Sequence, residues 1–223
     1  MKISTRLVVV AVGAAAISAG CFSGSYALAT ANDSGSTEII SRELPWDDST
    51  SLSLGVRSVL RYVQQDGPGK VVARGPHRSI STLLVSNGHI HDQLLRTGAT
   101  LELTIFAPAI SRFQLNGGSR LSIEGYDQRQ LYLSTEGSAF VEAVGRADSA
   151  TIEMRGKGVI NLSRLTLASA EANIGGMSTL VLAPSHGADL KVRNFAAAVL
   201  LTRPTALSTA LADSGRVVDA AGR

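Results

Sequence analysis

The second half of the chain repeats itself every 19 to 20 residues. Each repeat opens at a corner of small residues, and an apolar pair follows four and six residues later. The corners are Gly117, Gly137, Gly156, Gly176 and, in place of a glycine, Phe195. The pairs are Leu121/Ile123, Val141/Ala143, Ile160/Leu162, Leu180/Leu182 and Val199/Leu201. Because residues two apart on a strand share a face, each pair is expected to point into one interior.

A repeat of this length is typical of a stacked solenoid. Several short strands per repeat favour an all-β parallel β-helix, in which successive coils rise by about 4.8 Å. The first members of the five pairs are predicted to form one buried column. The spaced leucine and asparagine pattern of leucine-rich repeats is missing, whereas a β-sandwich remains the alternative because short strands at this spacing also suit it.

Residues 1–31 have the pattern of a cleaved signal peptide. Lys2 and Arg6 precede an apolar run over residues 7–19, which is short for a membrane span, and small residues offer cleavage sites up to residue 31. The chain's single cysteine, Cys21, lies in a segment that partly resembles a lipoprotein processing site. Soluble export is predicted, and lipidation of Cys21 is the alternative.

The composition argues against internal disulfides and against nucleic-acid binding. With one cysteine in the chain, no internal disulfide can form. The 21 basic residues against 18 acidic ones include Lys2 and Arg6, so cleavage of the leader leaves a nearly neutral protein. The sequence therefore does not predict nucleic-acid binding.

The rest of the chain divides into three parts. Residues 32–45 are predicted to be a disordered linker, residues 46–204 the β-helix domain, and residues 205–223 a tail or a short cap. Within the domain, a turn over residues 66–69 precedes a strand over residues 70–74.

Three motifs occur in a familiar order: the turn Gln65-Asp66-Gly67, the strand over residues 103–108 that ends at Pro108, and the small-residue corners that begin with Asn116-Gly117-Gly118. Over roughly residues 46–203 this order resembles the putative auto-transporter adhesin, head GIN domain family. The resemblance implies a right-handed parallel β-helix and an envelope or surface location. It implies no catalytic residues.

The local pattern most suggestive of a metal site is His89 and His91. Two residues apart on a strand, their imidazoles would share a face, and Asp92 or His77 could supply a third ligand. The turn Asn87-Gly88 just before them gives a simpler interpretation, two exposed histidines at the start of a strand. No metal, cofactor or catalytic residue is predicted.

Carboxylates and arginines recur through the repeats without a forced cluster. Glu124, Glu142 and Glu153 lie on successive coils but out of register with the corners. The recurring arginines could line a groove for acidic glycans or simply keep the surface soluble; they are Arg120, Arg129, Arg146, Arg155, Arg164 and Arg193.

We therefore expect a non-catalytic, exported bacterial envelope protein of the periplasm or cell surface. Its ribbed surface would bind a glycan, a cell-wall polymer or another envelope protein, or serve as a scaffold. One alternative is a small carbohydrate-active β-helix enzyme, a lyase or hydrolase. Another is a membrane-anchored structural lipoprotein, and membrane contact is expected only if Cys21 is lipidated.

Overall fold

The computed structural model describes residues 38–93 and 100–221. All of them belong to one compact unit, Gly35–Arg223. The predicted leader, with Cys21, lies outside the described residues. Within them, the structure contains one short helix, α1 (His77–Ser81), and no helix long and apolar enough to cross a membrane.

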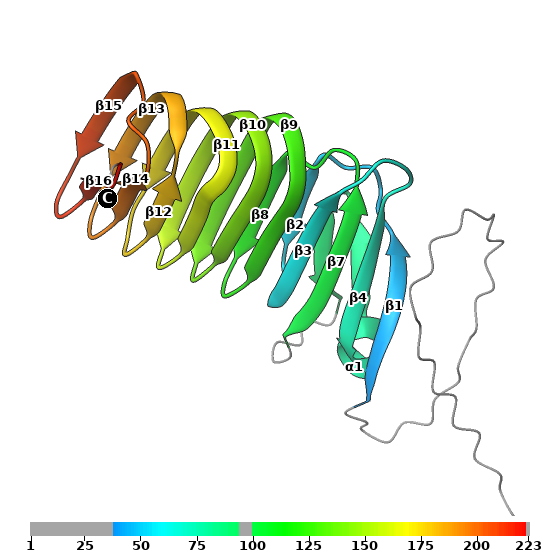
Figure 1. Ribbon diagram of the computed structural model, residues 1–223. Helices are drawn as coiled ribbons and strands as arrows, with labels where there is room; N and C mark the ends of the chain where they lie inside the picture. Colours follow the sequence, from blue (N-terminus) through cyan, green and yellow to red (C-terminus); the bar gives the residue numbers. More distant parts are fainter. Residues whose placement is uncertain (1–37, 94–99, 222–223) are drawn as a thin grey trace, which may run out of the picture. The chain divides into compact units, whose positions relative to one another are not determined.

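Strands form nearly all of the regular structure (Figure 1). In chain order they are β1 (Ile39–Pro45), β2 (Ser51–Leu54), β3 (Ser58–Gln64), β4 (Lys70–Pro76), β5 (Leu83–Ser86), β6 (His89–Asp92), β7 (Leu101–Ala107), β8 (Arg112–Asn116), β9 (Arg120–Gly137), β10 (Phe140–Gly156), β11 (Val159–Ile174), β12 (Thr179–Leu182), β13 (Pro184–Val192), β14 (Ala197–Leu200), β15 (Ala206–Leu211) and β16 (Arg216–Asp219).

The strands wind into coils with two layers. The first layer runs β1-β4-β7-β3-β9-β10-β11-β12-β14-β16, and the second runs β5-β6-β2-β8-β9-β10-β11-β13-β15. The long strands β9, β10 and β11 belong to both layers, because each bends partway along its length. In β9 and β10 the bend contains a glycine with positive φ, Gly125 (65°) and Gly145 (138°). β4 pairs antiparallel with β1 and β7, and β5 pairs antiparallel with β6. From β8 onward neighbouring coils pair in parallel, which confirms the predicted parallel β-helix.

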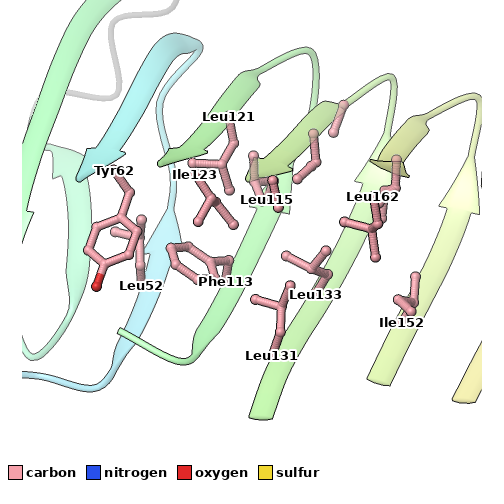
Figure 2. Close-up of a cluster of buried hydrophobic side chains, with 14 of the residues drawn as sticks. Leu52, Tyr62, Phe113, Leu115, Leu121, Ile123, Leu131, Leu133, Ile152 and Leu162 are labelled. Atoms are coloured by element: carbon pink, nitrogen blue, oxygen red, sulfur yellow. The ribbon is translucent and has the colours of Figure 1, made fainter. Parts of the chain in front are cut away.

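Aliphatic side chains stack between the two layers. Leu121, Val141, Ile160 and Leu180 are each paired with the next across adjacent strands and are 0% exposed. Figure 2 shows Leu121 and Ile123 inside the coils, with Leu133 and Ile152 on the strands of the second layer. The predicted interior column is confirmed for these four repeats. Each rung buries its aliphatic pair against the rungs before and after it.

The fifth repeat differs from its prediction by one residue. Leu180 pairs with Ala198, so the buried pair is Ala198/Leu200 rather than Val199/Leu201, and Leu201 is 37% exposed. The corner is Asn194, with φ of 60°, and not Phe195. Asparagine tolerates this left-handed conformation better than most residues, so it can replace the expected glycine.

The first coils lie out of sequence order. In the first layer β7 is inserted between β3 and β4, and in the second layer β2 separates β6 from β8. The predicted turn over residues 66–69 is present, but its two flanking strands are not neighbours because β7 lies between them. Tyr62 supports this arrangement: its hydroxyl donates to the Ala107 carbonyl at 3.1 Å and accepts from the Ile110 amide at 3.2 Å.

Both ends of the predicted domain differ from expectation. Residues 39–45, predicted to be linker, form β1, which pairs antiparallel with β4 along its whole length and buries Leu44. Residues 206–219, predicted to be a tail or cap, form β15 and β16, which continue the parallel stack. Asp213, with φ of 58°, makes the corner between them, a second non-glycine corner that the glycine pattern did not reveal.

Candidate functional site

The outward side of the second layer is polar. Side chains from neighbouring strands align there in columns because the strands pair in register. One column contains Tyr132, Thr151, Glu171 and Asp189, and the next contains Ser134, Glu153, Asn173 and Lys191. We call these eight residues the polar face. By contrast, the outward side of the first layer carries the column Val181, Val199 and Val218 toward its C-terminal end.

A groove of about 490 Å³ adjoins the polar face at the corner of the coils. Its floor is backbone, because glycines occupy the corner positions: Gly156, Gly175 and Gly176 line it. A side chain at Gly176 would meet the carbonyl oxygen of Gly156 at 2.3 Å, so the stacking of the corners requires glycine there. The same requirement leaves the hollow open.

The walls of this corner groove carry both charges and amides. Glu153, Arg155, Asn173, Arg193, Asn194 and Asp213 line it. The guanidinium of Arg193 donates to Oδ1 of Asn173 at 2.9 Å, which fixes the arginine beside the polar face. Asn194 in turn accepts from the Gly176 amide at 3.3 Å through its Oδ1 atom. Two arginines beside amide and carboxylate groups suit hydrogen bonding to a polar or acidic ligand.

Two aromatic residues belong to this region, Tyr132 in the polar face and Phe195 next in sequence to the groove residue Asn194. The guanidinium of Arg112 stacks over the ring of Tyr132 at 4.2 Å. Burial, followed by the nearby Glu153 carboxylate, raises the pKa of Tyr132, so its hydroxyl stays protonated and can donate a hydrogen bond. Phe195, next to Asn194, is 72% exposed and offers a flat apolar surface beside the corner groove.

The histidines predicted as a metal pair lie at the start of β6, after a turn in which Asn87 and Gly88 both have positive φ. His89 is exposed and His91 half-buried, on the outward side of the strand. Asp92 points inward instead, 6% exposed, and accepts from the Thr82 hydroxyl at 2.7 Å. Within residues 38–93 and 100–221, no group of three or more histidine, cysteine or acidic side chains is placed to hold a metal.

The predicted carboxylates separate onto two surfaces. Glu124 and Glu142 belong to the first layer, and Glu153 belongs to the polar face of the second. The structure instead places Glu171 beside Asp189 on neighbouring strands, a pair the sequence did not single out because its members belong to different repeats.

The predicted arginines do not form one ladder. Arg155 and Arg193 share the corner groove, whereas Arg120 lies over the ring of Phe140 at 4.9 Å and Arg146 lies 3.9 Å from Asp127. Trp46 is 4% exposed and donates to the Ser49 carbonyl, so it is part of the core. Phe195, taken as a corner residue from its spacing, is 72% exposed.

The fold is thus a parallel β-solenoid with a polar face and a corner groove. A family model described as "Putative auto-transporter adhesin, head GIN domain" matches residues 62–204, and the chain belongs to that family. This confirms the resemblance read from the motifs. No curated protein matches the chain.

Two crystal structures share this fold at low sequence identity. A putative adhesin from Bacteroides fragilis NCTC 9343 is 16% identical with a TM-score of 0.63, and the match covers 82% of this chain and 97% of that one. A putative lipid binding protein from Parabacteroides distasonis ATCC 8503 is 14% identical with a TM-score of 0.52, over the same shares. At these identities the likeness shows the fold alone.

Proposed function

We propose that this chain is an exported envelope protein that binds an extended, polar polymer along its polar face and corner groove, without catalysis. A glycan or cell-wall polymer is the favoured ligand class. The corner groove is the observation that carries the proposal, because it brings together two arginines, two amides and two carboxylates.

The regular spacing of the polar face supports a polymeric ligand. Equivalent side chains on successive strands repeat about every 4.8 Å, so a chain molecule lying across the strands meets similar groups at each step. The arginines offer planar forks to carboxylate or phosphate groups of an acidic glycan. Tyr132, within the polar face, and the exposed Phe195 add apolar ring surfaces.

The test is binding of the purified protein to glycan arrays and to isolated cell-wall polymer. Replacing Arg155 and Arg193 together with alanine is expected to weaken binding about a hundredfold, because each lost charge-assisted hydrogen bond contributes about 1.5 kcal/mol. Phe195→Ala should weaken it as well. Arg120→Ala, which removes an arginine from the first layer, is the matched control and should bind as the wild type does. Equal binding by all variants would show that the ligand lies elsewhere.

Catalysis is the competing function to test. The wild-type protein, incubated with acidic and neutral polysaccharides, is expected to release no new reducing ends and no unsaturated products. The corner groove contains two carboxylates, Glu153 and Asp213, and glycoside hydrolysis ordinarily needs two carboxylates flanking one bond, so this measurement decides between the two functions. Sustained product release that is lost in a Glu153→Gln variant would replace binding with an enzymatic function.

The leader pattern and the family support export. Mass spectrometry of the mature N-terminus distinguishes its two forms: a start near Asn32 means soluble export, and a diacylated Cys21 means a lipid anchor. An unprocessed Met1 in the cell envelope fraction would contradict both.

A further inference from the structure

The coil made by β15 and β16 leaves both of its outer edges unpaired. Among the described residues, β15 pairs with β13 alone and β16 with β14 alone. Each therefore presents backbone N–H and C=O groups without a strand beside them. Such an edge is a template for another strand.

The interior of the stack is open at the same place. Leu207 and Leu211 pair with the inward-facing Ala188 and Val192 of β13, so they continue the core columns. Yet Leu207 is 51% exposed and Leu211 is 53% exposed, whereas Ala188 and Val192 are 5% and 0% exposed. Two leucines at inward-facing positions of this coil are therefore exposed to solvent.

At the opposite end of the stack the edge of the first layer is protected. There the first layer ends in β1, which carries Arg42, Glu43 and Pro45, and Arg42 donates to the Ile80 carbonyl of α1 at 3.3 Å. Charged residues and proline on an edge strand discourage pairing with other strands. β15 contains neither, since its sequence is Ala-Leu-Ser-Thr-Ala-Leu.

The arrangement of β15 and β16 favours a second copy of this chain over a single peptide as the binding partner. A single peptide could cover β15 or β16 but not both, because the two strands lie in different layers. A second open coil of the same cross-section covers both edges and both leucines at once. A two-fold axis perpendicular to the layers pairs each strand antiparallel with its own copy and keeps inward side chains facing inward.

The charges of this coil are self-complementary under that symmetry. β16 begins at Arg216 and ends at Asp219, so antiparallel pairing places the positive end of one copy beside the negative end of the other. The loops at the two ends of β16 are also complementary. Asp213 lies in the corner before β16, and Arg203 lies beside its other end, 3.0 Å from Asp219. The two-fold axis therefore places Asp213 of one copy on the same side as Arg203 of the other.

We propose that two copies of this chain associate tail to tail through β15 and β16, forming one continuous solenoid with the β1 end of each copy outward. The dimer closes the open core and pairs the free strand edges. It also presents two polar faces in one direction, related by the two-fold axis. The proposal rests on the β15–β16 coil and is independent of what the corner groove binds.

The test is sedimentation velocity of the full chain, as recovered from expressing cells, over a range of concentrations. The wild type is expected to be a dimer. Leu207→Lys with Leu211→Lys should raise the dimer dissociation constant about a hundredfold or more, because it places like charges at the contact. Leu84→Lys makes the same chemical change at an exposed leucine of β5 and should leave the dimer intact. Circular dichroism confirms that each variant is folded.

A charge exchange tests the symmetry without altering the core. Arg216→Asp and Asp219→Arg should each weaken self-association about tenfold, because each variant places like charges opposite one another. Mixing the two variants should restore the dimer as a heterodimer. A wild type that stays monomeric, a dimer that tolerates the lysines, or a mixture no tighter than its components would each overturn the proposal.

Discussion

At the residue scale, the corners decide whether coils can stack. Gly137, Gly156 and Gly176 lie above one another with positive φ, and a β-carbon at Gly156 would come within 2.5 Å of the Gly137 carbonyl oxygen. Asn194 and Asp213 occupy the next two corners, also with positive φ. There, side-chain hydrogen bonds connect successive corners. The Asn194 amide donates to Oδ2 of Asp213 at 3.2 Å, so the acid side chain links its own corner to the one before it.

Gly156→Ala tests the close approach of two corners. We expect a loss of about 2 to 3 kcal/mol in the free energy of unfolding, from the left-handed backbone and from the contact with Gly137. Gly67→Ala is the matched control, because Gly67 also has positive φ (109°) but nothing within 4 Å of a β-carbon. Its cost should be nearer 1 kcal/mol in urea titrations. Equal losses would mean that backbone conformation alone matters.

Asn194 tests the non-glycine corner. Asn194→Ala removes the side-chain acceptor for Gly176 and leaves an alanine in a left-handed conformation, so we expect a loss of about 1 to 2 kcal/mol. Asn194→Gly loses the same hydrogen bond but relaxes the backbone, and should lie within about 0.5 kcal/mol of the wild type. Thermal and urea unfolding of the three proteins measure this order. An alanine variant as stable as the glycine variant would contradict it.

At the element scale, β3 is where the out-of-order coils meet the regular repeats. It pairs in parallel with β7 on one side and with β9 on the other. Across the β3–β9 boundary the Arg61 guanidinium holds both oxygens of Glu124, at 2.8 and 2.5 Å. The hydrogen bonds from Arg61 hold the pKa of Glu124 below its usual range. This pair joins residues 63 positions apart in the sequence.

The lowered pKa of Glu124 determines how the contribution of the Arg61–Glu124 pair to stability changes with pH. A lowered pKa in the folded state means that the unfolded chain takes up the proton first. The stabilisation is therefore complete above the usual glutamate pKa of 4.5 and is lost as pH falls through the lower folded value. We expect Glu124→Gln to cost about 0.5 kcal/mol at pH 7, since the pair is partly exposed, and almost nothing at the acid end.

The measurement is urea unfolding of wild type and variant at several pH values. Glu102→Gln is the control, because it removes the more exposed pair with Arg74 on β4 and should cost less at pH 7. A difference between wild type and Glu124→Gln that does not change between pH 7 and pH 3 would contradict the assignment.

At the scale of the whole molecule, burial is uneven along the stack. The central coils bury their inward side chains fully, as Ile152 and Leu162 do at 0% exposure, whereas all of β15 is exposed. In a solenoid each coil is stabilised chiefly by its neighbours, so a coil with one neighbour is the weakest.

Matched truncations at the centre and at the open end measure this gradient. Ile152→Ala is expected to cost about 3 to 4 kcal/mol, because it leaves a cavity between two layers that cannot collapse onto it. Leu207→Ala should cost less than about 1 kcal/mol when measured at concentrations where the chain is monomeric. Similar costs at both places would show that the coil of β15 and β16 is as well packed as the centre.

The glycine corners and aliphatic pairs by themselves determined the coil, its period and the interior column from Leu121 to Leu180, because each requirement is local: positive φ at the corner and alternation along the strand. Local pattern could not reveal Asn194 and Asp213 as corners, since their side chains act only when the neighbouring coil is present.

Long-range packing decided the rest. The insertion of β7 between β3 and β4, the pairing of Arg61 with Glu124 and the meeting of Arg155 with Arg193 in one groove all join segments that the chain order keeps apart. A repeat fixes how one coil follows another. Burial and hydrogen bonding between stacked coils decide the order in which the first strands pair. They also decide which side chains lie close together on the surface.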